Sequence, residues 1–337
     1  MSGAAVTRDG LRGVRPGREA RSWSGADSAY RVAEPDSHPG ASYYGQPVIN
    51  APPWKESEIA GYLFTGGLAG ASSLLAAGAG LTGRPDLARR AELCASAAAA
   101  VSLAALVADL GRPTRFINML RVFKPTSPMS VGTWMLSAYV PLTVAATIGD
   151  LLARTPRTSA LARGGAGALG AGVATYTAAL ISNTSVPAWR DGRRELPFLF
   201  AGSAASAAGG FGLIAAPAHE RGPAARMGAI GAVGELVAEM LLERRLGDIA
   251  DTLHEGTAGR RLRAAKALSA VGALGAAVCA GGCRRRSTQG VARAAGAALM
   301  AGSLLTRFGL FAAGLESARD PKYTVDPQRR RLDADAR

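Results

Sequence analysis

The sequence predicts an all-α, polytopic membrane protein with about eight transmembrane helices. Hydrophobic residues make up 48% of the 337 residues, and apolar windows long enough to span a membrane recur along the chain. Such a window needs about 20 mostly apolar residues to cross roughly 30 Å of hydrocarbon. Mean hydropathy is only +0.11, because polar tails and a charged loop dilute segments that consist largely of Ala, Gly, Leu and Val.

The chain divides into three predicted parts. Residues 1–57 are rich in Arg, Gly, Ser and Pro without apolar periodicity, so we expect a disordered or extended arm. They lack an apolar core followed by a cleavage site, which argues against a signal peptide. Residues 58–317 form the transmembrane domain, and residues 318–337 form a polar tail. The eight predicted spans are 58–81, 87–110, 130–153, 162–186, 196–217, 225–246, 265–283 and 289–315.

Three links between spans are longer and more polar than the others. They are Asp109–Trp134, Val186–Pro197 and Asp248–Lys266. An even number of spans places all three on the same side as both termini. Basic residues occur in nearly equal numbers on the two sides, so the positive-inside rule does not set the orientation. The formal charge of +14 lies mainly in tails and at span ends, which favours lipid headgroups over nucleic acid as partners.

The cysteines and histidines exclude several redox cofactors. No pair of cysteines forms a CxxC motif, so we expect neither an iron–sulfur cluster nor a disulfide framework. No two histidines could face each other across a bundle interior, so we expect no intrinsic haem, and we expect no metal site. Electrons for any redox role must come from another subunit. The three cysteines are Cys94, Cys279 and Cys283, and the three histidines are His38, His219 and His254.

Small residues recur at helical spacing inside the spans. Gly66 and Gly70 are one turn apart, a spacing that allows close contact between membrane helices. Residues Gly165–Gly170 have the pattern GxGxxG, followed about twenty residues later by Asp191. A dinucleotide site would need a preceding strand, whereas this segment lies in an apolar helix. We therefore interpret it as a packing surface.

Three blocks of sequence resemble the NrfD/polysulfide-reductase (PsrC) family of integral membrane subunits. The first is Trp54 followed by YLFTGGLAG at Tyr62–Gly70. The second is DLGRPTRFINML at Asp109–Leu120, followed by SPMSVGTW at Ser127–Trp134. The third is TYTAALISNTSVPAWRDGRRELPFLF at Thr175–Phe200.

This resemblance implies two four-helix bundles in the cell membrane and a role in respiratory electron transport. The subunit would exchange electrons between membrane quinone (menaquinone or ubiquinone) and a docked, ferredoxin-like iron–sulfur subunit, with a molybdopterin catalytic subunit beyond it. It would have no turnover and no catalytic residues of its own. The quinone pocket implied by the matching positions involves Tyr62, Asp109, Arg112, Arg115 and Trp134.

Two residues near the implied pocket, Asp109 and Asn183, each have two interpretations. Asp109 ends the second span next to Arg112 and Arg115. It is either an interfacial salt bridge or the proton acceptor that quinone chemistry needs at the lipid–water boundary. Asn183 either donates a hydrogen bond to a quinone carbonyl or caps a helix.

Glu235, Glu239 and Glu243 follow one another at four-residue intervals in the sixth span, so they share one helical face. Acids within a membrane usually face the bundle interior or a water-filled cavity. Glu235 and Glu239 therefore form either a proton pathway, together with Asp109, or a structural pairing.

Two other functions compete with this one. A secondary transporter or ion translocator would have broken helices around a midplane site, but only Pro141 interrupts a span. A purely structural anchor would keep the fold without the quinone site.

Overall fold

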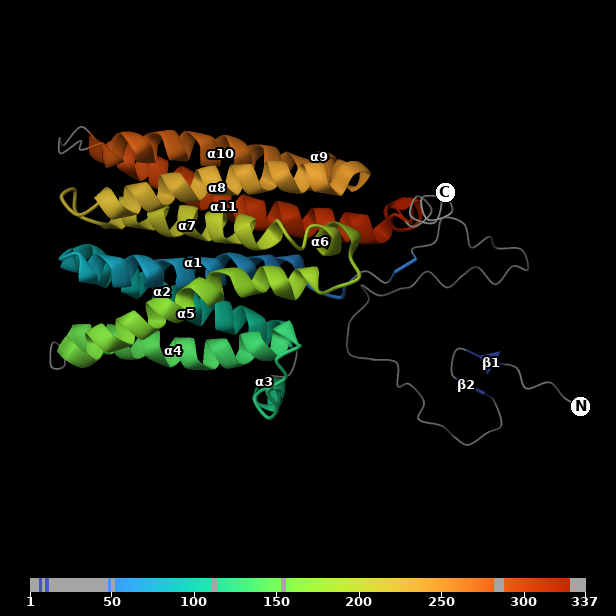
Figure 1. Ribbon diagram of the computed structural model, residues 1–337, viewed down its shortest axis with the longest axis horizontal. Coiled ribbons are helices and arrows are strands. Elements are labelled where there is room, and N and C mark those ends of the chain that lie inside the picture. The colour runs from blue at the N-terminus through green and yellow to red at the C-terminus, as the bar shows by residue number, and fades with distance from the viewer. Residues whose placement is uncertain are drawn as a thin grey trace, which may run out of the picture. The chain divides into compact units, whose positions relative to one another are not determined.

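The computed structural model describes residues 6–7, 10–11, 48–49, 52–110, 114–152, 156–281 and 288–327 (Figure 1). The chain divides into two units, residues 1–46 and 47–337. In the first unit, the described residues form two short antiparallel strands, β1 (Val6–Thr7) and β2 (Gly10–Leu11), with Val6 opposite Leu11. The predicted disordered or extended arm falls largely outside the described residues.

The second unit is built from long helices, which confirms the predicted all-α class. Among the residues that the structure describes, seven helices are long and apolar enough to cross a membrane. The long helices are α1 (Glu56–Leu81), α2 (Pro85–Asp109), α4 (Pro128–Leu152), α5 (Pro156–Ser182), α7 (Leu196–Ala215), α8 (Gly222–Leu246), α10 (Gly256–Ala280) and α11 (Thr288–Arg319).

Helix α8 is the long helix that falls short of the apolarity of a typical span. It matches the predicted sixth span but contains Glu235, Glu239 and Glu243. It nevertheless packs along α7 and α10, so it belongs to the same bundle as these two helices. Helix α10 begins at Gly256, before the predicted start at 265, because the charged stretch Arg260–Lys266 continues the helix.

Local sequence explains where several helices begin. Proline occupies one of the first two positions of α2, α7 and α8, where its fixed φ fits the helix and its missing N–H costs nothing. The turn from α1 to α2 ends at Gly83, which has a φ of 68°, a conformation that glycine adopts without steric cost.

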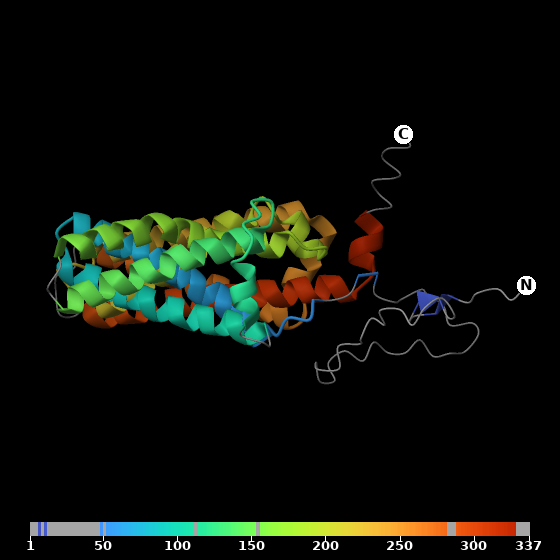
Figure 2. The same ribbon diagram turned by 90° about the horizontal axis from the view of Figure 1, so that it is seen from below.

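The helices pack as two groups of four, as expected. In one group α1, α2, α4 and α5 contact one another, and in the other α7, α8, α10 and α11 do so (Figures 1 and 2). The two groups meet mainly where α1 lies along α7 and α11 and where α5 lies along α7. Helices α1 and α7 therefore form the seam between the groups.

Glycines bring the backbones together at these contacts. A β-carbon added at Gly70 of α1 would overlap the carbonyl oxygen of Gly170 in α5, and one at Gly209 of α7 would overlap Gly228 of α8. Gly167 likewise packs against Ser73 and lies in the middle of α5. The GxGxxG segment is thus a helix-packing surface, as predicted.

Short helices occupy the three long links. They are α3 (Thr114–Met119), α6 (Pro187–Asp191), the 3-10 helix η1 (Gly247–Ala250) and α9 (Asp251–His254). All lie at the end of the helices where α1 begins and α11 ends (Figure 1). We call this the link end. The predicted grouping of the three links on one side is confirmed for the described residues.

Candidate functional site

Tyr62 and Asp109 lie along the contact between α1 and α2. Tyr62 is buried, and its carbonyl oxygen accepts a hydrogen bond from the Ser102 hydroxyl of α2 at 3.4 Å. Asp109, half-buried at the end of α2, interacts with the backbone of Lys55 and with Glu58 at the start of α1. The contact between α1 and α2 therefore includes both of these predicted quinone-site residues.

The remaining predicted quinone-site residues are more peripheral. Trp134 is 42% exposed, and its ring meets that of Phe123 edge to face, with centroids 6.2 Å apart. Arg115 is partly buried and donates a hydrogen bond to the Leu110 carbonyl at 3.2 Å. Asn183 is exposed at the end of α5. Arg112 lies outside the described residues.

Three cavities of the described part lie elsewhere. One runs between α7 and α8, one lies beside Arg190 at the link end, and one lies near Thr82 at the opposite end. A cleft for the quinone ring next to Asp109 therefore stays a prediction, and so do the quinone-binding roles of the residues around it.

Two of the acids of α8, Glu235 and Glu239, face inward and are buried. Glu235 is 1% exposed and Glu239 is 3% exposed. The Ser269 hydroxyl of α10 lies 3.3 Å from Oε2 of Glu235. Lys266, also in α10, lies 3.7 Å from Glu239 and 2.5 Å from Glu243. Their shared face, predicted from the four-residue spacing, is thus turned toward α10.

Arg307 of α11 completes this arrangement, although it was not among the site residues predicted from the sequence. Its side chain is 1% exposed, donates a hydrogen bond to the Phe200 carbonyl at 2.8 Å and stacks over the Phe200 ring, with its guanidinium carbon 3.6 Å from the ring centroid. It also interacts electrostatically with Glu235. An arginine near the middle of an apolar span is rare and usually functional, and that signal would have identified it.

These groups form a series that we call the buried charge row, because its first three members are buried. It consists of Arg307, Glu235, Glu239, Lys266 and Glu243. At its outer end, Nε2 of His254 in α9 lies 3.9 Å from Glu243. The row therefore extends from the seam between the helix groups to the link end.

Several polar atoms of the row lack hydrogen-bond partners among the described residues. They are Oε1 of Glu235, Oε1 of Glu239, and Nε and Nη1 of Arg307. Buried polar atoms are nearly always hydrogen-bonded, and exceptions call for an explanation such as ordered water or a catalytic role. Carboxyl groups and a lysine placed in series can pass protons along the helices, and their unpaired polar atoms can hydrogen-bond to the proton carriers between them.

Trp189 fixes the link that contains α6. Its indole N–H donates to the Leu310 carbonyl of α11 at 3.0 Å, and its ring stacks on Trp54 with centroids 6.0 Å apart. Phe311 packs against the same ring at 5.4 Å. This cluster holds the segment before α1, the α6 link and α11 together, and so gives the link end a defined structure.

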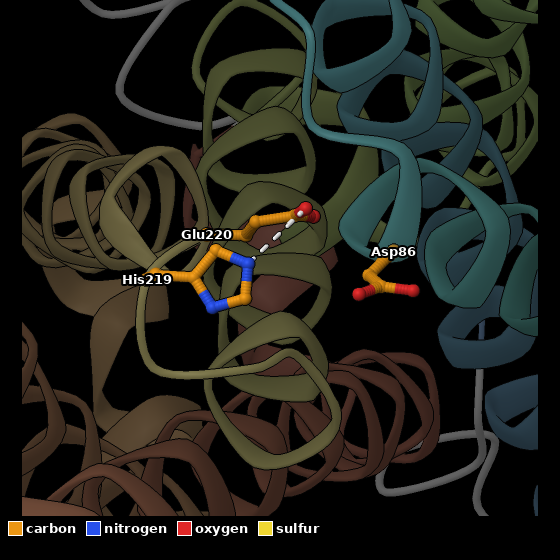
Figure 3. A group of neighbouring side chains, drawn as sticks. All are labelled: Asp86, His219 and Glu220. Carbon is orange, nitrogen blue, oxygen red and sulfur yellow. Dashed lines mark ion pairs between the residues drawn. The ribbon is translucent and has the colours of Figure 1, made fainter.

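A group of possible metal ligands lies at the opposite end. The ligand atoms of Asp86, His219 and Glu220 are all within 4.8 Å of one another (Figure 3). However, Oε2 of Glu220 accepts a hydrogen bond from the Leu87 backbone N–H at 2.6 Å, in the first turn of α2. Carboxylates at a helix N-terminus are stabilised by its partial positive charge, so we assign Glu220 to capping α2.

Comparison with known families identifies the chain. The family model described as polysulphide reductase, NrfD, matches residues 50–240, which is more than half of the chain. The matched segment runs from just before α1 into α8 and includes Tyr62, Asp109, Glu235 and Glu239. A comparison with curated proteins gave no match. The chain belongs to the NrfD polysulphide reductase family and is a multi-pass membrane protein of that family.

Proposed function

We propose that the protein is the quinone-reactive membrane subunit of a multi-subunit oxidoreductase. In this role it passes electrons between membrane quinone and an iron–sulfur subunit docked at the link end, with a molybdopterin catalytic subunit beyond it, in the cell membrane. The observation that carries the proposal is the family match over residues 50–240, which contains both the α2–α4 link and the α6 link. These links lie at the end of the helices where α1 begins, and Asp109 is the last residue of α2 before the first of them.

The quinone is the substrate, and its chemistry sets requirements that this end of the protein can meet. Reduction takes up two electrons and two protons, and oxidation of the quinol releases them. The electrons pass to or from the clusters of the partner. A half-buried carboxylate at the membrane boundary, such as Asp109, is suited to transfer the protons. The exposed ring of Trp134, near the start of α4, offers an aromatic surface.

The buried charge row supports a second, related function, which is proton movement through the second helix group. Glu235 and Glu243 are eight residues apart on α8, a rise of about 12 Å along the helix. Lys266 lies 3.7 Å from Glu239 and 2.5 Å from Glu243, so the step between these two acids is bridged by an amine. Buried ionisable residues in membrane proteins commonly mark such relays.

Two measurements test the quinone function. The first is purification of the protein from its native membrane, which should bring with it a subunit containing iron–sulfur clusters. The second is reduction of those clusters by added menadiol, followed by electron paramagnetic resonance. Asp109→Asn should abolish the reduction while leaving the subunits associated, because the amide cannot accept the quinol proton.

Asp86→Asn is the matched control, since it makes the same change at the opposite end of the same helix. It should leave cluster reduction intact. Normal reduction in the Asp109→Asn complex would refute the role of Asp109. Absence of any cluster-bearing partner, together with solute uptake by the lone subunit, would instead indicate a transporter.

A further inference from the structure

An apolar groove runs between α7 and α8 on the membrane-facing side of the second helix group. Its volume is about 630 Å³. On α8 it extends from Met227 to Leu241, which is about 21 Å of helix at 1.5 Å per residue. This length exceeds half of the roughly 30 Å hydrocarbon core, so the groove spans the depth of one lipid leaflet.

Small residues form the floor of the groove. A β-carbon at Gly202 would meet the Glu235 backbone at 2.6 Å, and one at Gly231 would meet the Ser206 backbone at 2.5 Å. The two helix backbones are therefore in direct contact there. A β-carbon at Gly234, by contrast, would meet no atom within 4 Å. Gly234 thus faces the open groove.

Large apolar side chains form its walls. Phe198 of α7 is 73% exposed and Ile230 of α8 is 72% exposed, and Val237 and Leu241 also project outward. Along a membrane span these side chains face hydrocarbon, and they flank the glycine floor on both helices. The groove is therefore suited to an acyl chain.

At the link end the groove adjoins a polar pocket of about 460 Å³. Glu195 lines the groove, and it forms an ion pair at 3.4 Å with Arg245, which lines the pocket. Arg190 and Arg193 are the other basic residues of the pocket, and both are exposed. Arg245 also donates to the Asp191 carbonyl at 2.9 Å, which holds its guanidinium at the junction.

We propose that the groove and this arginine pocket together bind one anionic phospholipid. Its phosphate lies between Arg190 and Arg193, and one acyl chain lies along the floor that includes Gly234. Two observations support this occupant. The apolar cavity runs at membrane depth, and the adjoining pocket carries an excess of positive charge at the level of the headgroups. Basic pockets between membrane helices bind such headgroups.

Native mass spectrometry of the full-length protein in detergent tests the site, with phosphatidylglycerol or phosphatidylcholine added. We expect one phosphatidylglycerol to bind in preference to phosphatidylcholine. Arg190→Gln combined with Arg193→Gln should weaken phosphatidylglycerol binding roughly thirtyfold, about fivefold for each arginine near the membrane surface. Gly234→Leu should weaken binding of both lipids by filling the groove.

Matched variants control for charge and for helix effects. Arg194→Gln combined with Arg244→Gln removes the same charge from exposed neighbouring positions that do not line the pocket. Gly164→Leu makes the same substitution at an open position of α5. Both controls should bind phosphatidylglycerol as the unaltered protein does.

Three outcomes would each overturn the proposal. The first is equal binding of the two lipids, and the second is an equal effect of the test and control variants. The third is a quinone that is retained in place of the lipid and is lost in Gly234→Leu.

Discussion

Arg307 of α11 and Gly67 of α1 meet across the seam between the two helix groups. A β-carbon at Gly67 would lie 3.3 Å from the guanidinium of Arg307 and 3.3 Å from Ala204 of α7. The absence of a side chain at Gly67 therefore leaves room for a buried cation. Because Tyr62 lies five residues earlier on α1, the buried charge row begins close to the predicted quinone region.

Arg307 and Glu235 should depend on each other for stability. Arg307→Met leaves Glu235 without its nearby positive charge, and breaking a buried charge pair costs roughly 3–5 kcal/mol. Adding Glu235→Gln to Arg307→Met should recover part of the loss, because no uncompensated charge then stays buried. The free energy of unfolding, measured in mixed micelles for the two single variants and the double variant, gives their coupling. Strictly additive losses would show that the two charges do not interact.

Glu239→Gln should slow proton movement through the second helix group. The amide keeps the shape of the side chain but cannot carry a proton past Lys266, and a positioned proton carrier contributes roughly a hundredfold or more to a transfer rate. The measurement is the change in internal pH of proteoliposomes under an imposed membrane potential. Glu255→Gln, an exposed position at the link end, is the control. Equal rates in the two variants would exclude a proton route through Glu239.

Gly70→Ala should weaken the contact between α1 and α5. The added methyl group would overlap the Gly170 carbonyl oxygen, and overpacking of this kind costs about 1–3 kcal/mol. Gly61→Ala changes the same helix at a position with open space around it, and should leave stability unchanged or slightly raised. The apparent melting temperatures of the two variants in the same detergent distinguish the effects. A melting temperature for Gly70→Ala equal to that of Gly61→Ala would mean that α1 and α5 accommodate the added methyl group without a loss of stability.

The elements of the fold could be predicted because each long helix carries its own pattern. Apolar stretches bounded by Pro, Gly and Arg marked the spans, even for α8, whose glutamates lower its hydropathy. The shared face of Glu235 and Glu239 followed from helical geometry alone. Similarly, the four-residue spacing of Gly66 and Gly70 predicted close helix packing, and Gly70 indeed contacts α5.

The contacts of the site could not be predicted, because they join helices that are distant in sequence. Glu235 and Arg307 are in α8 and α11, and nothing local to either residue specifies the other. Asp109 was expected beside Arg112 and Arg115, whereas the structure adds Lys55 and Glu58 of α1 as neighbours. The groove between α7 and α8 likewise depends on how closely two backbones approach, which composition alone does not determine.

Trp189 should be the most sensitive aromatic position of the link end. It is fully buried, donates to the Leu310 carbonyl and stacks on Trp54. A β-carbon at Gly314 would overlap the Trp189 ring, so the absence of a side chain at Gly314 allows α11 to pack against that ring. Trp189→Ala leaves a cavity and should cost roughly 3–5 kcal/mol in the free energy of unfolding.

Trp134→Ala is the control for that prediction, because Trp134 is 42% exposed and its loss removes little buried surface. Limited proteolysis gives a second measurement, since loss of the Trp189 contacts should release the α6 link and let its backbone unfold into the active site of trypsin at Arg190 and Arg193. Trp134→Ala should leave cleavage there unchanged. If Trp189→Ala unfolded no more easily than Trp134→Ala and its α6 link stayed resistant, the cluster would not be what holds the link end together.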